Sequence, residues 1–96
     1  MKKLYAIIDT ASTLIIGGVH VFAHDAAAIR FFGDLVGDPQ TMMGRHPNDH
    51  NLLALASLDE ETGELLTDGC PSVVVTGAAL KASQQQAQEQ AERSNG

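Results

Sequence analysis

Four histidines are the residues of this 96-residue chain best suited to binding a transition metal, and they occur as two pairs, His20/His24 and His46/His50. Imidazole nitrogens are common zinc ligands, and two of them four residues apart converge when they share one face of a helix. His20 and His24 lie in or beside a segment with strand character, where four residues span about 13 Å. Pro47 directly follows His46 and disfavours a helix interior there. We therefore expect no metal site and no other cofactor.

The other side chains that could bind calcium or act as nucleophiles lack the sequence motifs that these functions require. The acidic segment 59–64 does not have the alternating D-x-[DN]-x-[DN]-G pattern of a calcium loop, so we expect a solvated turn. Ser12, Ser57 and Cys70 have no nucleophile signature such as G-x-S-x-G around them. The chain also lacks the phosphate-binding pattern G-x-x-x-x-G-K-[ST]. These observations predict a protein that is not an enzyme.

Cationic and aromatic side chains are the remaining candidates, because single-stranded nucleic acid is bound by cations on its phosphates and by rings stacked on its bases. Aromatic residues at strand or helix spacing more often belong to the core, and this chain has only three Phe and one Tyr with which to build one. The candidate nucleic-acid-binding residues are Lys2, Lys3, Tyr5, Arg30, Phe31 and Arg45.

The charge balance argues against a tight, non-specific nucleic-acid binder. Six basic and twelve acidic residues give a net charge of −6, and the basic residues are scattered along the chain. Affinity for DNA is set largely by Lys and Arg on phosphates. A local basic patch would still form if Lys2, Lys3 and Arg45 converged in the fold.

The cysteine content and the apolar segments indicate a cytoplasmic protein. The single cysteine, Cys70, excludes an internal disulfide and suits a reducing compartment. Asp9 interrupts the first apolar run, unlike the core of an export signal. No apolar stretch approaches the roughly 18 residues of a membrane span, so we expect no membrane association.

The elements that must position these residues follow from hydrophobic spacing. Segment 25–37 has its apolar residues on one face at helical period, with Asp25 expected as the N-cap and Gly37 before Asp38-Pro39 as the end. Segment 38–51 reads as a loop. Expected strands cover 4–9, 14–23, 52–58, 64–67 and 72–76, with the acidic hairpin turn at 59–63.

Together these elements predict an α+β fold: a small, mostly antiparallel sheet of four to five strands with one packed helix and a polar, partly disordered C-terminal tail. The single domain is expected to cover 1–80, and the Gln/Ala-rich segment 81–96 reads as a frayed helix or a disordered tail. A chain of this length buries only about 60–65% of its unfolded surface. Such a marginal core favours a homodimer.

Several short motifs, taken in order, resemble one family. The motifs are Lys2–Ala11, Ala28–Phe32 (A-x-R-F-F), Asp38-Pro39, Met43–Asp49 (MGRHPND) and Asp59–Gly63 (DEETG). Their arrangement is similar to that of the small nonstructural protein of gokushovirus-type microviruses, which are tailless single-stranded-DNA phages. That protein is also described as a fifth-open-reading-frame, DNA-binding or DNA-packaging protein.

The resemblance implies a non-enzymatic role in the host cytoplasm, during single-stranded DNA synthesis and packaging. Two hypotheses follow. In the first, the protein binds viral DNA through the six residues named above. In the second, it is an adaptor that contacts the replication initiator or the coat protein without touching DNA. The acidic turn and the low number of basic residues favour the adaptor, because an acidic surface complements a basic DNA-handling protein.

Overall fold

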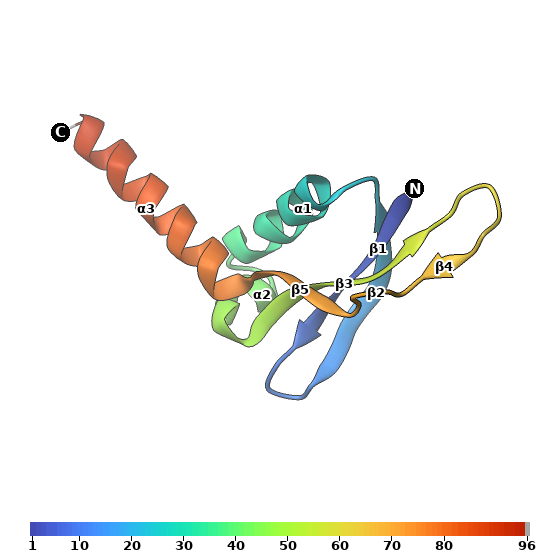
Figure 1. Cartoon of the computed structure of the whole chain (residues 1–96). Coiled ribbons are helices and arrows are strands. Elements are labelled where there is room, and N and C mark those ends of the chain that lie inside the picture. Colours follow the sequence, from blue (N-terminus) through green and yellow to red (C-terminus); the bar gives the residue numbers. More distant parts are fainter. Residues whose placement is uncertain (96) are drawn as a thin grey trace.

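The computed structural model describes the backbone of residues 1–95 and the side chains of residues 1–92. It contains one antiparallel sheet with the strand order β2-β1-β3, and both β4 and β5 pair with β3 (Figure 1). The predicted α+β class is therefore confirmed. The strands are β1 (Lys2–Asp9), β2 (Leu14–Phe22), β3 (His50–Leu58), β4 (Leu65–Leu66) and β5 (Ser72–Thr76). The helices are α1 (Asp25–Gly37), α2 (Met42–Arg45), the 3-10 turn η1 (Pro47–Asp49) and α3 (Gly77–Asn95).

The pairing of β1 with β3 forms the middle of the sheet. Their register runs from Lys2 opposite Leu58 to Asp9 opposite His50, with one shift between Leu4 and Tyr5. Side chains alternate between the two faces of a strand. Tyr5 therefore points towards α1, whereas its neighbour Leu4 points to the opposite face of the sheet.

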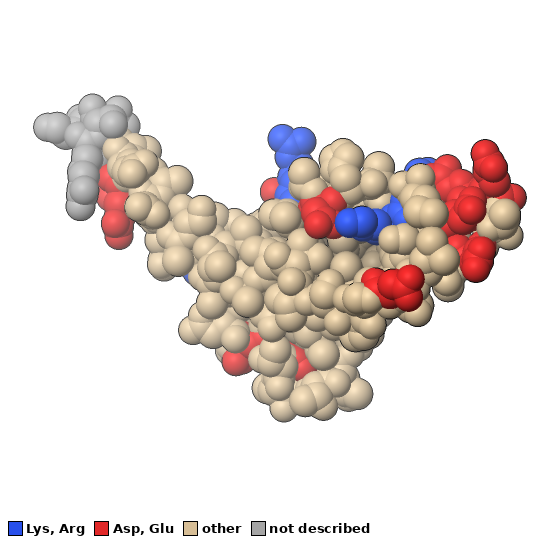
Figure 2. Space-filling model, viewed as in Figure 1, with Lys and Arg blue, Asp and Glu red and all other residues tan. Residues whose placement is uncertain are grey.

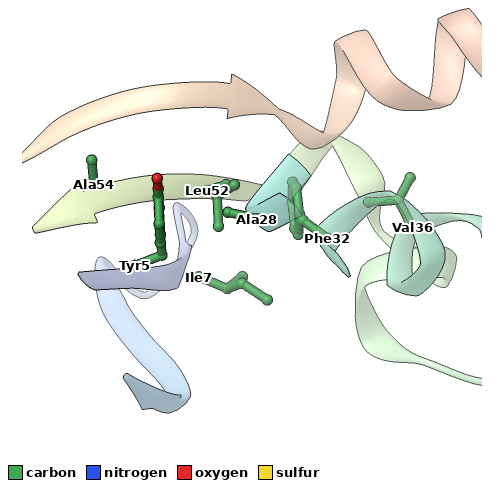
Figure 3. Packing of buried hydrophobic residues seen from close by; sticks show 7 residues of the cluster. All are labelled: Tyr5, Ile7, Ala28, Phe32, Val36, Leu52 and Ala54. Atoms are coloured by element: carbon green, nitrogen blue, oxygen red, sulfur yellow. The ribbon is translucent and has the colours of Figure 1, made fainter. Parts of the chain in front are cut away.

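Helix α1 spans the predicted residues, and its apolar stripe forms the core with β1 and β3 (Figure 3). Phe32, Tyr5 and Leu52 are fully buried where the helix meets the two strands. Burial of one such side chain stabilises the fold by about 1.5–3 kcal/mol relative to its exposure. The buried cluster comprises Tyr5, Ile7, Ala28, Phe32, Val36, Leu52 and Ala54.

The N-terminus of α1 is capped by His24 and not, as predicted, by Asp25. His24 has an extended backbone, and its Nδ1 accepts a hydrogen bond from the Ala27 amide at 3.4 Å. Asp25 is the first helical residue, so its carboxylate lies at the positive end of the helix dipole without capping it. This change frees the Asp25 side chain to reach the sheet.

The predicted loop after α1 contains two short helical turns, α2 and η1. The Thr41 hydroxyl caps α2 by accepting a hydrogen bond from the Gly44 amide at 2.9 Å. The same hydroxyl donates a hydrogen bond to the Leu35 carbonyl oxygen at 2.6 Å. Helices of four and three residues are too short to show an apolar period, which is why the sequence indicated only a loop.

Two glycines allow backbone segments to meet where any side chain would collide. A Cβ atom on Gly44 would overlap the carbonyl oxygen of Asp38, and one on Gly77 would overlap the carbonyl oxygen of Pro47. Gly44 thus lets α2 fold back on the end of α1. Gly77 lets the start of α3 pack against η1.

The C-terminal segment is a helix through Asn95, which is the frayed-helix form of the two expected for this segment; Gly96 lies outside the described residues. Helix α3 crosses the expected domain boundary near residue 80. Its first turns are fixed by Leu80 against the core and by the Gln84 amide, which donates to the Gly33 carbonyl at 2.9 Å. Residues 85–92 are exposed and project away from the sheet (Figure 1). None of the described helices is long and apolar enough to cross a membrane.

We predict that Gly44→Ala destabilises the protein by about 2 kcal/mol or more, because the added methyl group cannot be placed without moving the chain around Asp38. Urea unfolding followed by circular dichroism measures this change. The matched control is Gly18→Ala, since a Cβ atom on Gly18 would meet no atom within 4 Å. Equal midpoints for the two variants would contradict the close approach.

Candidate nucleic-acid interface

The beginning of β1, the end of β2 and the beginning of α1 meet at one corner of the sheet. Lys3 lies opposite Phe22 and Tyr5 opposite His20 in the register of β1 and β2. Because opposite residues share a face, all four side chains point to the face that α1 covers. We call this set the α1 corner, defined by Lys3, Tyr5, His20, Phe22, Asp25 and Phe31.

A polar network ties α1 to β1 at this corner. The Asp25 carboxylate accepts a hydrogen bond from the Tyr5 hydroxyl at 2.6 Å and one from the Lys3 ammonium at 3.3 Å. The hydrogen bond from Tyr5, supported by Lys3, holds the pKa of Asp25 below its usual value, although partial burial acts in the other direction. Burial and the neighbouring Asp25 carboxylate raise the pKa of Tyr5 well above that of a free tyrosine. The Lys3 charge is therefore already compensated within the chain.

Four rings pack beside this network. The centroid of the Phe31 ring lies 4.7 Å from that of His20 and 5.5 Å from that of Phe22, and Phe22 lies 5.9 Å from Tyr5. These tilted arrangements are typical of stabilising aromatic pairs. His20, Phe22 and Phe31 are each partly exposed. Phe31 thus packs against the core but retains some accessible surface.

Three of the six candidate residues, Lys3, Tyr5 and Phe31, come together at the α1 corner. The structure does not fit base stacking by Tyr5, because its ring is 0% exposed and its hydroxyl is bound to Asp25. We correct the role of Tyr5 to that of a core residue that fixes α1 on the sheet. Phe31 remains the one candidate aromatic residue with accessible surface.

The other three candidates lie apart. The Lys2 ammonium is 3.9 Å from Glu60, whereas Arg30 is exposed on α1 and Arg45 is exposed at the end of α2. The segment that carries Arg45 meets the sheet at the Asp9 end of β1. Asp9 is seven residues along the strand from Lys2 and six from Lys3, which correspond to about 23 Å and about 20 Å. The convergence of Lys2, Lys3 and Arg45 considered from the sequence does not occur.

Acidic residues gather instead, on the turn that joins β3 to β4. Figure 2 shows Asp and Glu side chains over this turn, at the end of the molecule opposite α3. The turn is closed by the Gly63 amide, which donates to the Asp59 carbonyl at 2.7 Å, and by the Glu61 amide, which donates to the Asp59 carboxylate at 3.0 Å. Glu60, Glu61 and Glu64 are exposed.

The four histidines have separate surroundings. His20 contacts Phe31, His24 caps α1, and His46 is exposed. His50 is buried, with Nδ1 2.8 Å from the His46 carbonyl oxygen and Nε2 without a hydrogen-bond partner among the described residues. In the part of the chain that the structure describes, no three His, Cys, Asp or Glu side chains gather as metal ligands would.

Two members of the corner, His20 and Asp25, were not predicted from the sequence as interaction residues. His20 and Phe22 are two residues apart in one strand and therefore share a face. The pairing of β2 with β1 is needed to know that this is the face covered by the helix. Asp25 was identified as a cap, and only the three-dimensional arrangement shows that it bonds the sheet instead. The corner therefore presents the partly exposed rings of His20, Phe22 and Phe31 beside Lys3, whose charge is compensated by Asp25.

A model of the protein family described as Phage ORF5 protein matches residues 2–80 of the chain. The matched range contains all strands of the described sheet, the whole of α1 and the anchored first residues of α3. It also contains all six candidate residues. No curated protein and no solved structure was found to match the chain.

We predict that the protein loses stability at both ends of the pH range through the Tyr5–Asp25 pair. The lowered pKa of Asp25 contributes stability at neutral pH that is lost as the pH falls below about 4. The raised pKa of Tyr5 contributes stability that is lost as the pH rises above about 10, where the tyrosine ionises in the unfolded chain but not in the folded one. Urea unfolding across the pH range measures both losses.

Tyr5→Phe is the matched variant for this pair. It should cost about 1 kcal/mol at neutral pH, because Asp25 is about half exposed and regains water. Both pH-dependent losses should become smaller than in the wild type. Since Tyr5 is the only tyrosine and the chain has no Trp, ultraviolet absorbance reports its ionisation directly. Ionisation of the folded protein at the pH of a free tyrosine would contradict the prediction.

Proposed function

Because the chain belongs to the Phage ORF5 protein family, we propose that it is a non-enzymatic phage protein that assists viral single-stranded DNA synthesis and packaging by binding a basic partner protein. The replication initiator and the coat protein of the phage are the partners we expect. The family membership supports the phage context, and the resemblance to microvirus nonstructural proteins suggests the stage of infection. The mode of action rests on the charge distribution.

The observation that carries the proposal is the cluster of exposed carboxylates on the acidic turn, together with the compensation of two of the cations inside the chain. The acidic turn between β3 and β4 presents exposed carboxylates at one end of the molecule (Figure 2). Of the four candidate cations, Lys2 and Lys3 already contact Glu60 and Asp25. Potentials of opposite sign guide two proteins together and fix their orientation. This chain therefore has a surface suited to a basic protein and lacks a continuous cationic surface for a phosphate backbone among its described residues.

The acidic turn is also preorganised for binding. Its backbone is held by Asp59 and Gly63, whereas the carboxylates of Glu60 and Glu61 take no part in closing it. Glu60 is half exposed, and its 3.9 Å contact with Lys2 is of the surface kind that contributes little to stability. A partner can thus engage these two carboxylates without paying to order the turn.

Direct binding of single-stranded DNA is the second candidate function, and one observation favours it. The partly exposed Phe31 lies in the α1 corner with Lys3, and its sequence neighbour Arg30 is exposed on α1. One ring and two cations resemble a minimal single-strand contact. So few phosphate contacts would give weak binding with a shallow dependence on salt.

The test of the adaptor uses the purified full-length chain with the purified replication initiator and coat protein of the same phage. We predict that Glu60→Gln/Glu61→Gln weakens binding to one of them about fivefold to tenfold, because the loss of two surface charges reduces the attraction. The control, Glu89→Gln/Glu92→Gln, removes the same charge from α3 and should bind like the wild type. Equal binding by both double variants would contradict a role for the turn.

Fluorescence anisotropy of a labelled single-stranded oligonucleotide, at low and moderate salt, separates the two functions. The adaptor proposal expects no saturable binding at micromolar protein and moderate salt. Saturable binding at low salt, with the shallow salt dependence of a few phosphate contacts and reduced by Arg30→Ala but not by Lys81→Ala, would replace the adaptor with direct DNA binding.

A further inference from the structure

The face of the sheet opposite α1 is mostly apolar and free of charged side chains over three rows of residues on neighbouring strands. Lys2 shares this face with Leu4 and lies just beyond the first row, next to Glu60. One row joins Val21 and Leu4 to Ala56, and the next joins Ala6 to Leu53 and Val73. The third row joins Ile15 and Ile8 to Asn51 and Thr76. We call these residues the open face.

Among the described elements, all the helices that contact the sheet pack on the face opposite the open face. The core cluster includes Tyr5 and Ile7 from the side of β1 that faces α1, but not their neighbours Leu4 and Ile8. On the open face, Ile15, Val21 and Val73 are each about half exposed, whereas the small side chains of Ala6 and Ala56 between them are buried. Contiguous apolar surface of this kind on a small protein marks an interaction site.

We propose that the open face binds a second copy of this chain, so that two sheets pack face to face as an isologous dimer. Two sheets packed in this way lie about 10 Å apart, and their inward side chains interdigitate into a shared core. In a two-fold dimer the same surface must complement itself, which uncharged Ile, Leu and Val side chains allow. The inference is independent of the proposed function, because the acidic turn lies outside these rows.

The size of the face sets the strength of the dimer. Four strands at about 4.8 Å spacing and all eight residues of β1, the Lys2 row included, give the whole sheet face an upper limit of about 19 Å by 26 Å, or about 500 Å² per copy. Two copies would therefore bury at most about 1,000 Å², which is the lower limit for a specific interface. We therefore expect weak association, with a Kd on the order of 10–100 µM.

The surface area of the monomer agrees with an additional interface. The chain exposes 6083 Å², whereas a compact monomer of this mass exposes about 5,300 Å². Its radius of gyration is 15.1 Å, against about 12.5 Å for a compact chain of 96 residues. The projecting part of α3 contributes to both differences, and the uncovered sheet contributes to the area.

Charge favours a second copy over a nucleic acid or a charged protein as the occupant. The three rows of the open face contain no cation for phosphates and no anion for a basic partner, and the Lys2 ammonium at their edge is compensated by Glu60. Each copy carries a net charge of −6, so two copies repel at long range. Salt screens this repulsion within a Debye length of about 8–10 Å. Association should therefore become stronger as the salt concentration rises, the opposite of an ionic interface.

Sedimentation equilibrium of the full chain from about 1 to 300 µM tests the proposal, since this range spans the expected Kd. The average mass should approach twice that of the chain, and the midpoint should move to lower concentration with added salt. Val21→Lys, at a residue 49% exposed on the open face, should weaken association at least tenfold. The matched control is Met42→Lys, because Met42 is 45% exposed but lies on α2. It should associate like the wild type.

Circular dichroism of each variant shows whether it is folded, and Val73→Lys on β5 replaces Val21→Lys if the latter is not. A wild-type chain that stays monomeric over the whole range would overturn the proposal. So would association that salt weakens, or that Val21→Lys and Met42→Lys change equally. A folded monomeric Val21→Lys variant beside a dimeric Met42→Lys variant supports it.

Discussion

The burial of Tyr5 is the constraint on which the rest of this small structure depends. A ring in the middle of the core must also place its hydroxyl group, and a buried hydroxyl without a partner is costly. Asp25 supplies the partner from the first turn of α1, so the hydrogen bond fixes where the helix begins over the sheet. That placement sets Phe32 and Val36 against β1 and β3 and brings Phe31 to the ring of His20. The same placement of α1 therefore determines both the packing of the core and the geometry of the α1 corner.

Local patterns were sufficient for the elements with a clear period. The apolar stripe of α1 and the β-branched run of β5 predicted both elements with the bounds that the structure has. The fold class followed from the same patterns. The patterns could not reveal α2 and η1, because turns this short carry no period, nor the extent of α3, whose Gln- and Ala-rich sequence has helix propensity but little to pack.

The candidate site was less predictable, since it depends on which strands pair. Lys3 and Phe31 were identified as candidates and do converge, but the sequence could not show that Asp25 compensates Lys3 or that Tyr5 is enclosed. The pairing of β1 with β3 keeps the cations apart, because it places Arg45 at the end of β1 that is far from Lys2 and Lys3. What results is a molecule with its surface properties separated: carboxylates at one hairpin, aromatic edges at one corner and an uncharged apolar sheet face.

The pairing of β1 with β3 also has a consequence for how the chain folds. Its two strands are more than forty residues apart, with β2, α1 and the short helices between them, so the central pair closes a long loop. Non-local pairing of this kind slows folding, because the loop-closure entropy is lost before the contacts form. The β1–β2 hairpin and α1 involve only local contacts and can form first. In contrast, β4 and β5 cannot pair, and the first turns of α3 cannot pack, until β3 has joined the sheet. During synthesis on the ribosome, the β1–β2 hairpin would therefore stand with an unpaired β1 edge until residue 58 has emerged.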